Sequence, residues 1–136
     1  MVLKMSLKKT KENGDKPPIS GVTLNNILKN ILERRFTEAG RIIDRMESRI
    51  KEKGYSDFAR GFIYGLRGII LMYRMRNRNT FISRLDLNDV NLLKKYYREF
   101  SEHAKNKLHG DYDRGYFSAL AKFMFFALKN AEKSKK

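Results

Sequence analysis

Arginines recur along one stretch of the chain at a spacing that suits phosphate binding. Arg60, Arg67 and Arg74 are seven residues apart, which on a helix places them on one face at intervals of about 10.5 Å. Guanidinium groups hold phosphate oxygens in pairs and stack on bases. Nothing in the pattern indicates base-specific reading, so we expect contacts to the backbone and shape of a nucleic acid. The predicted nucleic-acid-binding residues are Arg60, Arg67, Arg74, Arg76, Arg78 and Arg84.

A second candidate is the segment Arg98-Glu99-Phe100-Ser101-Glu102-His103. It resembles the R-x4-H signature of the HEPN family of helical ribonucleases, which usually act as dimers. The resemblance implies that Arg98 stabilises the scissile phosphate and that His103 acts as acid or base. Five residues along a continuous helix turn through about 140°, so convergence needs a kink or a second subunit. The alternative makes His103 a surface residue beside Glu99, and we therefore favour no catalytic residue.

The composition excludes several classes of function. The 136 residues include no cysteine and only two histidines, so we predict no disulfide, no metal site and no cofactor. Lys and Arg number 30 against 15 Asp and Glu, a formal charge of +15. Such a surface attracts phosphate-rich or acidic partners. A thermophile surface, which the lack of glutamine and tryptophan also suggests, explains a high charged fraction but not two bases for each acid.

The elements that position these residues come from an internal repeat. Arg60-Gly61-Phe62-Ile63-Tyr64-Gly65-Leu66 aligns with Arg114-Gly115-Tyr116-Phe117-Ser118-Ala119-Leu120, and Phe36-Thr37-Glu38 with Phe100-Ser101-Glu102. In each copy an amphipathic helical pattern precedes a glycine and a second helix rich in aromatic and small residues. The sequence therefore predicts an all-α protein of four main helices, arranged as two similar antiparallel hairpins.

Helix start and stop signals give the predicted boundaries. The first helix runs from Thr23 to Lys53, and the second from Ser56 or Asp57 to Arg76. A third, capped by Asp86 or Asn88, ends at Gly110, and a fourth runs from Asp111 to about Ala131. The segment Phe123 to Leu128 is apolar all round, which suits either a central helix or one half-covered by a second subunit, so a homodimer stays open. The predicted hairpins span about 23–77 and 86–131.

Three glycines lie on nearly one face of the second predicted helix, Gly61, Gly65 and Gly68. Because a glycine inside a helix costs about 1 kcal/mol relative to alanine, we expect a neighbouring helix to approach closely there. Two hairpins with small residues at their contacts resemble tetratricopeptide-type repeats over residues 24 to 131. A compact four-helix bundle with a pseudo-two-fold repeat fits equally well.

Basic tails flank the predicted domain of residues 20–132. Residues 1–19 carry interleaved lysines and residues 133–136 end in Lys135 and Lys136, so both would add sequence-independent affinity for phosphate. No apolar run reaches signal-peptide or membrane-span length, and we expect a cytoplasmic protein. The predicted function is non-catalytic binding of RNA, preferred over DNA, or of a ribonucleoprotein. A HEPN-like ribonuclease and a helical-repeat adaptor for an acidic protein remain the alternatives.

Overall fold

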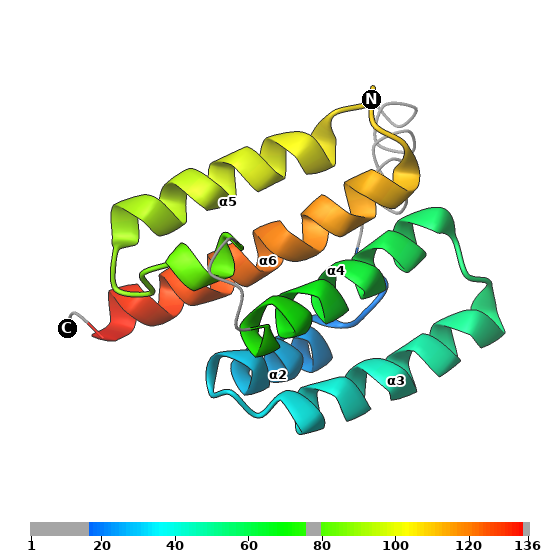
Figure 1. The fold of residues 1–136 in the computed structure, drawn as a ribbon. Coiled ribbons are helices and arrows are strands. Elements are labelled where there is room, and N and C mark those ends of the chain that lie inside the picture. The colour runs from blue at the N-terminus through cyan, green and yellow to red at the C-terminus, as the bar shows by residue number, and fades with distance from the viewer. Residues whose placement is uncertain (1–16, 76–79, 135–136) are drawn as a thin grey trace, which may run out of the picture.

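The computed structural model describes residues 17–75 and 80–134, and every regular element within these ranges is helical (Figure 1). The elements of the described chain are α2 (Gly21–Leu32), α3 (Phe36–Lys53), α4 (Asp57–Arg74), η1 (Ile82–Arg84, a 3-10 helix), α5 (Val90–Lys105) and α6 (Asp111–Ser134). The predicted all-α class is confirmed. None of these helices is both long and apolar enough to cross a membrane.

The predicted single helix over Thr23–Lys53 is wrong, because the chain leaves the helical conformation between α2 and α3. Arg34 adopts the left-handed conformation, with φ of 62°. Its N–H donates to the carbonyl of Ile31, and the N–H of Arg35 donates to the carbonyl of Asn30. These two bonds define a Schellman C-cap, which usually has glycine at the left-handed position. The described chain therefore has five α-helices where the sequence predicted four.

The boundaries of the later helices follow the prediction more closely. Ser56 caps α4, since its side chain accepts a hydrogen bond from the N–H of Ala59 at 3.1 Å. The cap of α5 is Asp89 rather than either predicted residue. α5 also ends at Lys105, earlier than predicted, and Leu108 is 94% exposed in the turn that follows.

The most extensive helix pair is α4 with α6, which run side by side in the same direction (Figure 1). A methyl group added to Gly61 of α4 would overlap the carbonyl oxygen of Tyr112 in α6. A methyl group added to Gly115 of α6 would overlap the carbonyl oxygen of Phe58 in α4. In each copy of the repeat the glycine packs against the backbone of the other copy, so the two contacts are reciprocal.

The same seam continues one turn further along both helices. A Cβ on Gly65 would lie 2.8 Å from the Cβ of Ala119, so this position also requires glycine. Gly68 faces the ring of Tyr116 at 3.8 Å, which is ordinary van der Waals contact. The predicted close approach is therefore confirmed at Gly61 and Gly65 but not at Gly68.

The helices α3 and α5 lie on the outer sides of the α4–α6 pair (Figure 1). The core between them includes Ile27, Phe62 and Phe123, which are fully buried. α6 is central, since it contacts α2, α4 and α5, although Phe125 is 42% exposed. Ile19, which the sequence placed in the N-terminal tail, is buried at 5% exposure, so the packed chain begins before residue 20. Residues 1–16 of that tail lie outside the described residues.

Candidate nucleic-acid interface

A shallow hollow of about 400 Å³ opens between α3 and α4, beside two of the six predicted arginines. We call it the arginine–tyrosine hollow. Its lining residues are Glu47, Lys51, Tyr55, Arg60, Ile63, Tyr64, Arg67 and Tyr112. Cationic side chains beside aromatic rings are the combination that proteins use to bind single-stranded nucleic acid. The hollow thus brings together the residue types that the proposed chemistry needs.

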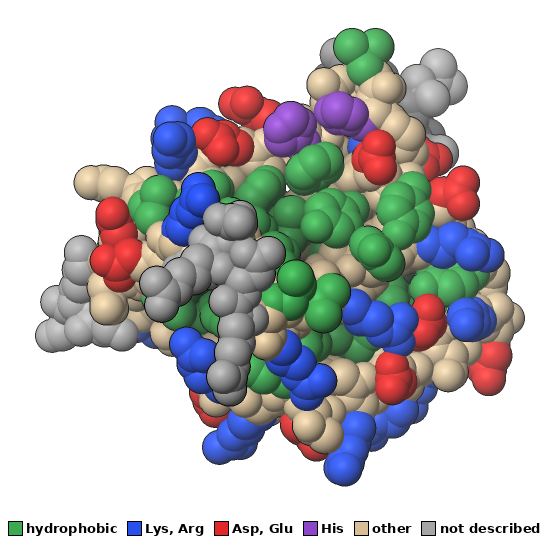
Figure 2. Space-filling view, viewed as in Figure 1, with side chains coloured by type: hydrophobic (Ala, Val, Ile, Leu, Met, Phe, Trp, Pro, Cys, Tyr) green, Lys and Arg blue, Asp and Glu red, His purple; other side chains and the backbone are tan. Residues whose placement is uncertain are grey.

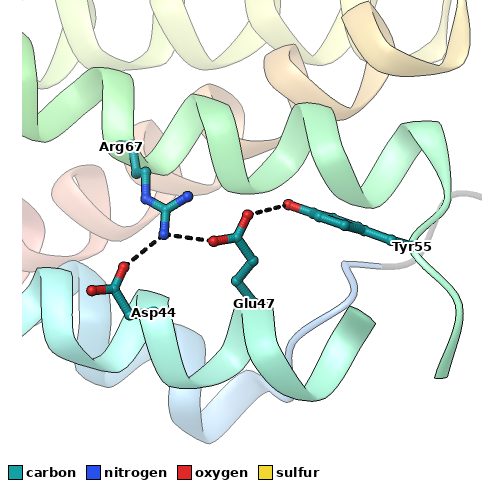
Figure 3. Close-up of polar contacts among 4 residues, drawn as sticks. All are labelled: Asp44, Glu47, Tyr55 and Arg67. Carbon is teal, nitrogen blue, oxygen red and sulfur yellow. Dashed lines mark hydrogen bonds and ion pairs between the residues drawn. The ribbon is translucent and has the colours of Figure 1, made fainter. Parts of the chain in front are cut away.

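Arg67 links the two helices that form the hollow (Figure 3). Its Nη2 donates to Asp44 Oδ1 at 2.6 Å and to Glu47 Oε1 at 2.8 Å, and both acids come from α3. The hydroxyl of Tyr55 donates to the other carboxylate oxygen of Glu47 at 2.7 Å. The charge of Arg67 is therefore offset by two carboxylates, and this arginine is less free to bind phosphate than its exposed neighbours.

The same contacts shift three ionisation equilibria. The hydrogen bond from Arg67 holds the pKa of Glu47 below its ordinary value, against a smaller opposing effect of burial. The hydrogen bond to Glu47 in turn raises the pKa of Arg67. Burial, together with the hydrogen bond to Glu47, raises the pKa of Tyr55 to about 12. Glu47 is thus an anion and Tyr55 a neutral donor at neutral pH, which keeps the ring of Tyr55 in place.

Arg60 lies against the ring of Tyr55. Its guanidinium carbon lies 4.7 Å from the centre of the Tyr55 ring, and its Nε donates to the carbonyl of Tyr55 at 3.4 Å. Lys51 Nζ lies 5.7 Å from the same ring. Neither cation forms an ion pair with an acid among the described residues. Two cations without a direct ion pair therefore flank a tyrosine ring that Glu47 holds.

The tyrosines on the other side of the hollow form an exposed cluster. The ring of Tyr64 lies 6.0 Å from that of Tyr112 and 6.1 Å from that of Tyr116. Tyr64 is 59% and Tyr112 39% exposed. The sequence analysis missed Tyr64, although it follows Arg60 by one helical turn and so shares its face. Figure 2 shows that hydrophobic side chains gather over this part of α4 and α6, with both basic and acidic side chains at their margin.

Arg74 and Arg84 lie away from the hollow. Arg74 is exposed at the end of α4, with its guanidinium 5.7 Å from the ring of Phe36. Arg84 is exposed in η1, which packs on α4. Arg76 and Arg78 lie outside the described residues. The structure therefore gathers Arg60 and Arg67 at one site, with Arg74 further along the same helix.

Arg98 and His103 do not converge within this chain. Both lie in the continuous helix α5, where five residues turn through about 140°. Arg98 lines a different hollow, beside Leu128 of α6. His103 stacks on Phe117 with ring centres 4.7 Å apart, and its Nδ1 lies 3.4 Å from Nε2 of His109. The part of the chain that the structure describes holds no cluster of three metal-ligating side chains.

Comparison with known proteins gives no relative for this chain. No family model, no curated protein sequence and no solved structure matches it.

Proposed function

We propose that this protein binds RNA, without catalysing a reaction, through the arginine–tyrosine hollow and the arginines that follow it on α4. The observation that supports this most is the pair of cations, Lys51 and Arg60, beside the anchored ring of Tyr55. The exposed rings of Tyr64 and Tyr112 offer stacking surfaces next to those cations. The formal charge of +15 adds a long-range attraction to any polyanion.

The contacts in the hollow indicate how an RNA strand would be held. Phosphates would contact Arg60 and Lys51, while a base would stack on Tyr64 or Tyr112. Arg67 would contribute mainly by holding α3 against α4, because Asp44 and Glu47 offset its own charge. Such binding has little sequence preference, since every base presents a flat ring to a tyrosine.

The test is a salt titration of RNA binding with a matched control. We expect Lys51→Ala with Arg60→Ala to weaken binding to all RNA sequences alike and to reduce the salt slope by about 0.7 to 0.9 for each phosphate that the variant no longer neutralises. The control is Arg45→Ala with Arg49→Ala, which removes the same charge from the opposite, exposed face of α3. An equal loss of affinity in both variants would mean that net charge, and not the hollow, binds RNA.

The same experiment separates the alternatives. Cleavage of the RNA that disappears in His103→Ala would support the ribonuclease, with a second subunit bringing Arg98 to His103. The adaptor alternative is favoured by an apolar stripe along α4 and its C-cap, formed by Tyr64, Leu71 and Met75, each at least 43% exposed. Failure of the wild-type protein to bind RNA near physiological salt would overturn the RNA proposal and favour the adaptor alternative.

A further inference from the structure

A second basic groove lies on the opposite side of α4 from the arginine–tyrosine hollow. It consists of two adjoining hollows of about 380 and 730 Å³ that share Pro17, Lys122 and Phe125. Phe58 of α4 lines the first of them. Nine residues separate Phe58 from Arg67, which is half a turn in angle around the helix. The two surfaces therefore face different directions and would not compete for one ligand segment. We call this the lysine groove.

The charge of the lysine groove is of one sign. Its lining includes Lys105, Lys122, Lys129 and Lys133 and contains no aspartate or glutamate among the described residues. Lys129 lies 3.8 Å from Glu132, but both side chains are more than 40% exposed, so water screens that pair. A second copy of this chain would bring the same positive charge to the groove.

Aromatic rings lie between these lysines. Lys122, Phe125, Lys129 and Lys133 follow one another at helical spacing on one side of α6. Phe125 is 42% exposed, its ring centre lies 5.4 Å from that of Tyr97, and Lys129 Nζ lies 5.3 Å from it. A base stacked on Phe125 would therefore bring its phosphate next to Lys129. The lysines span about 16.5 Å along α6, which is long enough to contact successive phosphates of one strand.

We infer that the lysine groove is a second binding surface for single-stranded nucleic acid, so that one protein molecule holds two strand segments. The inference rests on the proposed function only in taking nucleic acid as the polyanion. In every other respect the inference depends on the lysines of the groove and on Phe125. An acidic protein segment would satisfy the lysines but would leave the exposed ring of Phe125 without a stacking partner.

The stoichiometry of binding tests this inference. With a short oligouridylate as the probe, native mass spectrometry of the full chain is expected to show two molecules bound. Lys122→Ala with Lys129→Ala and Lys133→Ala should remove one binding event, and the hollow variant Lys51→Ala with Arg60→Ala should remove the other. A single bound molecule, absent in the hollow variant and present in the groove variant, would overturn the groove and leave the hollow. The converse result would support the groove and overturn the hollow.

A conservative variant separates stacking from charge. Phe125→Leu keeps every lysine and an apolar side chain beside Tyr97 but removes the aromatic ring, and is expected to weaken oligouridylate binding at the groove about tenfold. Poly-glutamate of equal charge serves as the probe for acidic protein segments. If poly-glutamate binds the groove as tightly as oligouridylate and Phe125→Leu changes neither, the groove is a site for acidic proteins and the nucleic-acid inference is wrong. Thermal unfolding of each variant identifies any loss of binding that comes from misfolding.

Discussion

Arg67 acts as a link between α3 and α4, because it donates hydrogen bonds to two carboxylates of α3. The seven-residue spacing correctly places Arg60, Arg67 and Arg74 on one helix and toward one side. It does not reveal that Asp44 and Glu47 reach Arg67, since their separations of 23 and 20 residues lie beyond any local spacing rule. Which arginine of a line stays available to a ligand thus depends on the neighbouring helix.

The lowered pKa of Glu47 predicts an acid-sensitive contact. A carboxyl whose pKa is lower in the folded state contributes its full stability above the ordinary value of 4.5 and loses it as pH falls through the folded value. We expect Glu47→Gln to lower the free energy of unfolding at neutral pH and to flatten its decline as the pH falls below 4.5. Urea unfolding at several pH values measures both effects.

The matched control for this prediction is Glu52→Gln, which removes the same charge from an exposed position of α3. It should leave the acid decline of the wild-type protein intact. Identical acid profiles for Glu47→Gln and the wild type would show that the link between α3 and α4 does not depend on that carboxylate.

At the scale of elements, the sequence predicts well where helices form and where small residues bring two helices together. It predicts poorly where a helix is interrupted. The glycines of α4 stand out because glycine is a poor helix former, and a close neighbour is the physical reason for them. The break at Arg34 has no comparable signal in the sequence, since arginine and not glycine occupies the left-handed position and the apolar periodicity continues across it. The predicted cap of α5 differs from the observed one by a few residues, because Asp86, Asn88 and Asp89 are all residues that favour helix N-termini.

The reciprocal glycine contact gives a prediction about stability. Gly61→Ala and Gly115→Ala are each expected to lower the free energy of unfolding by about 1 to 3 kcal/mol, because the added methyl group overlaps a backbone carbonyl that cannot move alone. Gly40→Ala in α3 is the control, since nothing lies within 4 Å of a Cβ there. That variant should instead be more stable by about 1 kcal/mol, the difference in helix propensity. Denaturant unfolding of the three variants measures this, and equal effects at all three glycines would contradict the close α4–α6 contact.

At the scale of the whole molecule, the dominant property is the excess of positive charge. The composition indicates an anionic partner, but it does not locate the surface that meets it, because Lys and Arg lie on several helices. Only the fold shows that acids offset Arg67, while no acidic residue among those described lines the lysine groove. The two candidate surfaces therefore differ in kind, one mixed in charge and rich in tyrosine, the other basic throughout.

Self-repulsion should make this protein more stable in salt. With a formal charge of +15, folding brings like charges together, and added salt screens that repulsion. The few exposed ion pairs that salt also weakens contribute little. We expect the midpoint of urea unfolding to rise as sodium chloride increases from about 0.05 to 0.5 M. A falling midpoint would mean that attractive pairs such as Arg67 with Glu47 outweigh the net charge.

The reciprocal contact of Gly61 and Gly115 also bears on how such a molecule could arise. A surface that meets its own counterpart is the interface of a symmetric homodimer, here enclosed in one polypeptide. A single ancestral hairpin with that glycine would assemble with an identical copy, and joining the two genes end to end would preserve the contact while freeing the halves to diverge.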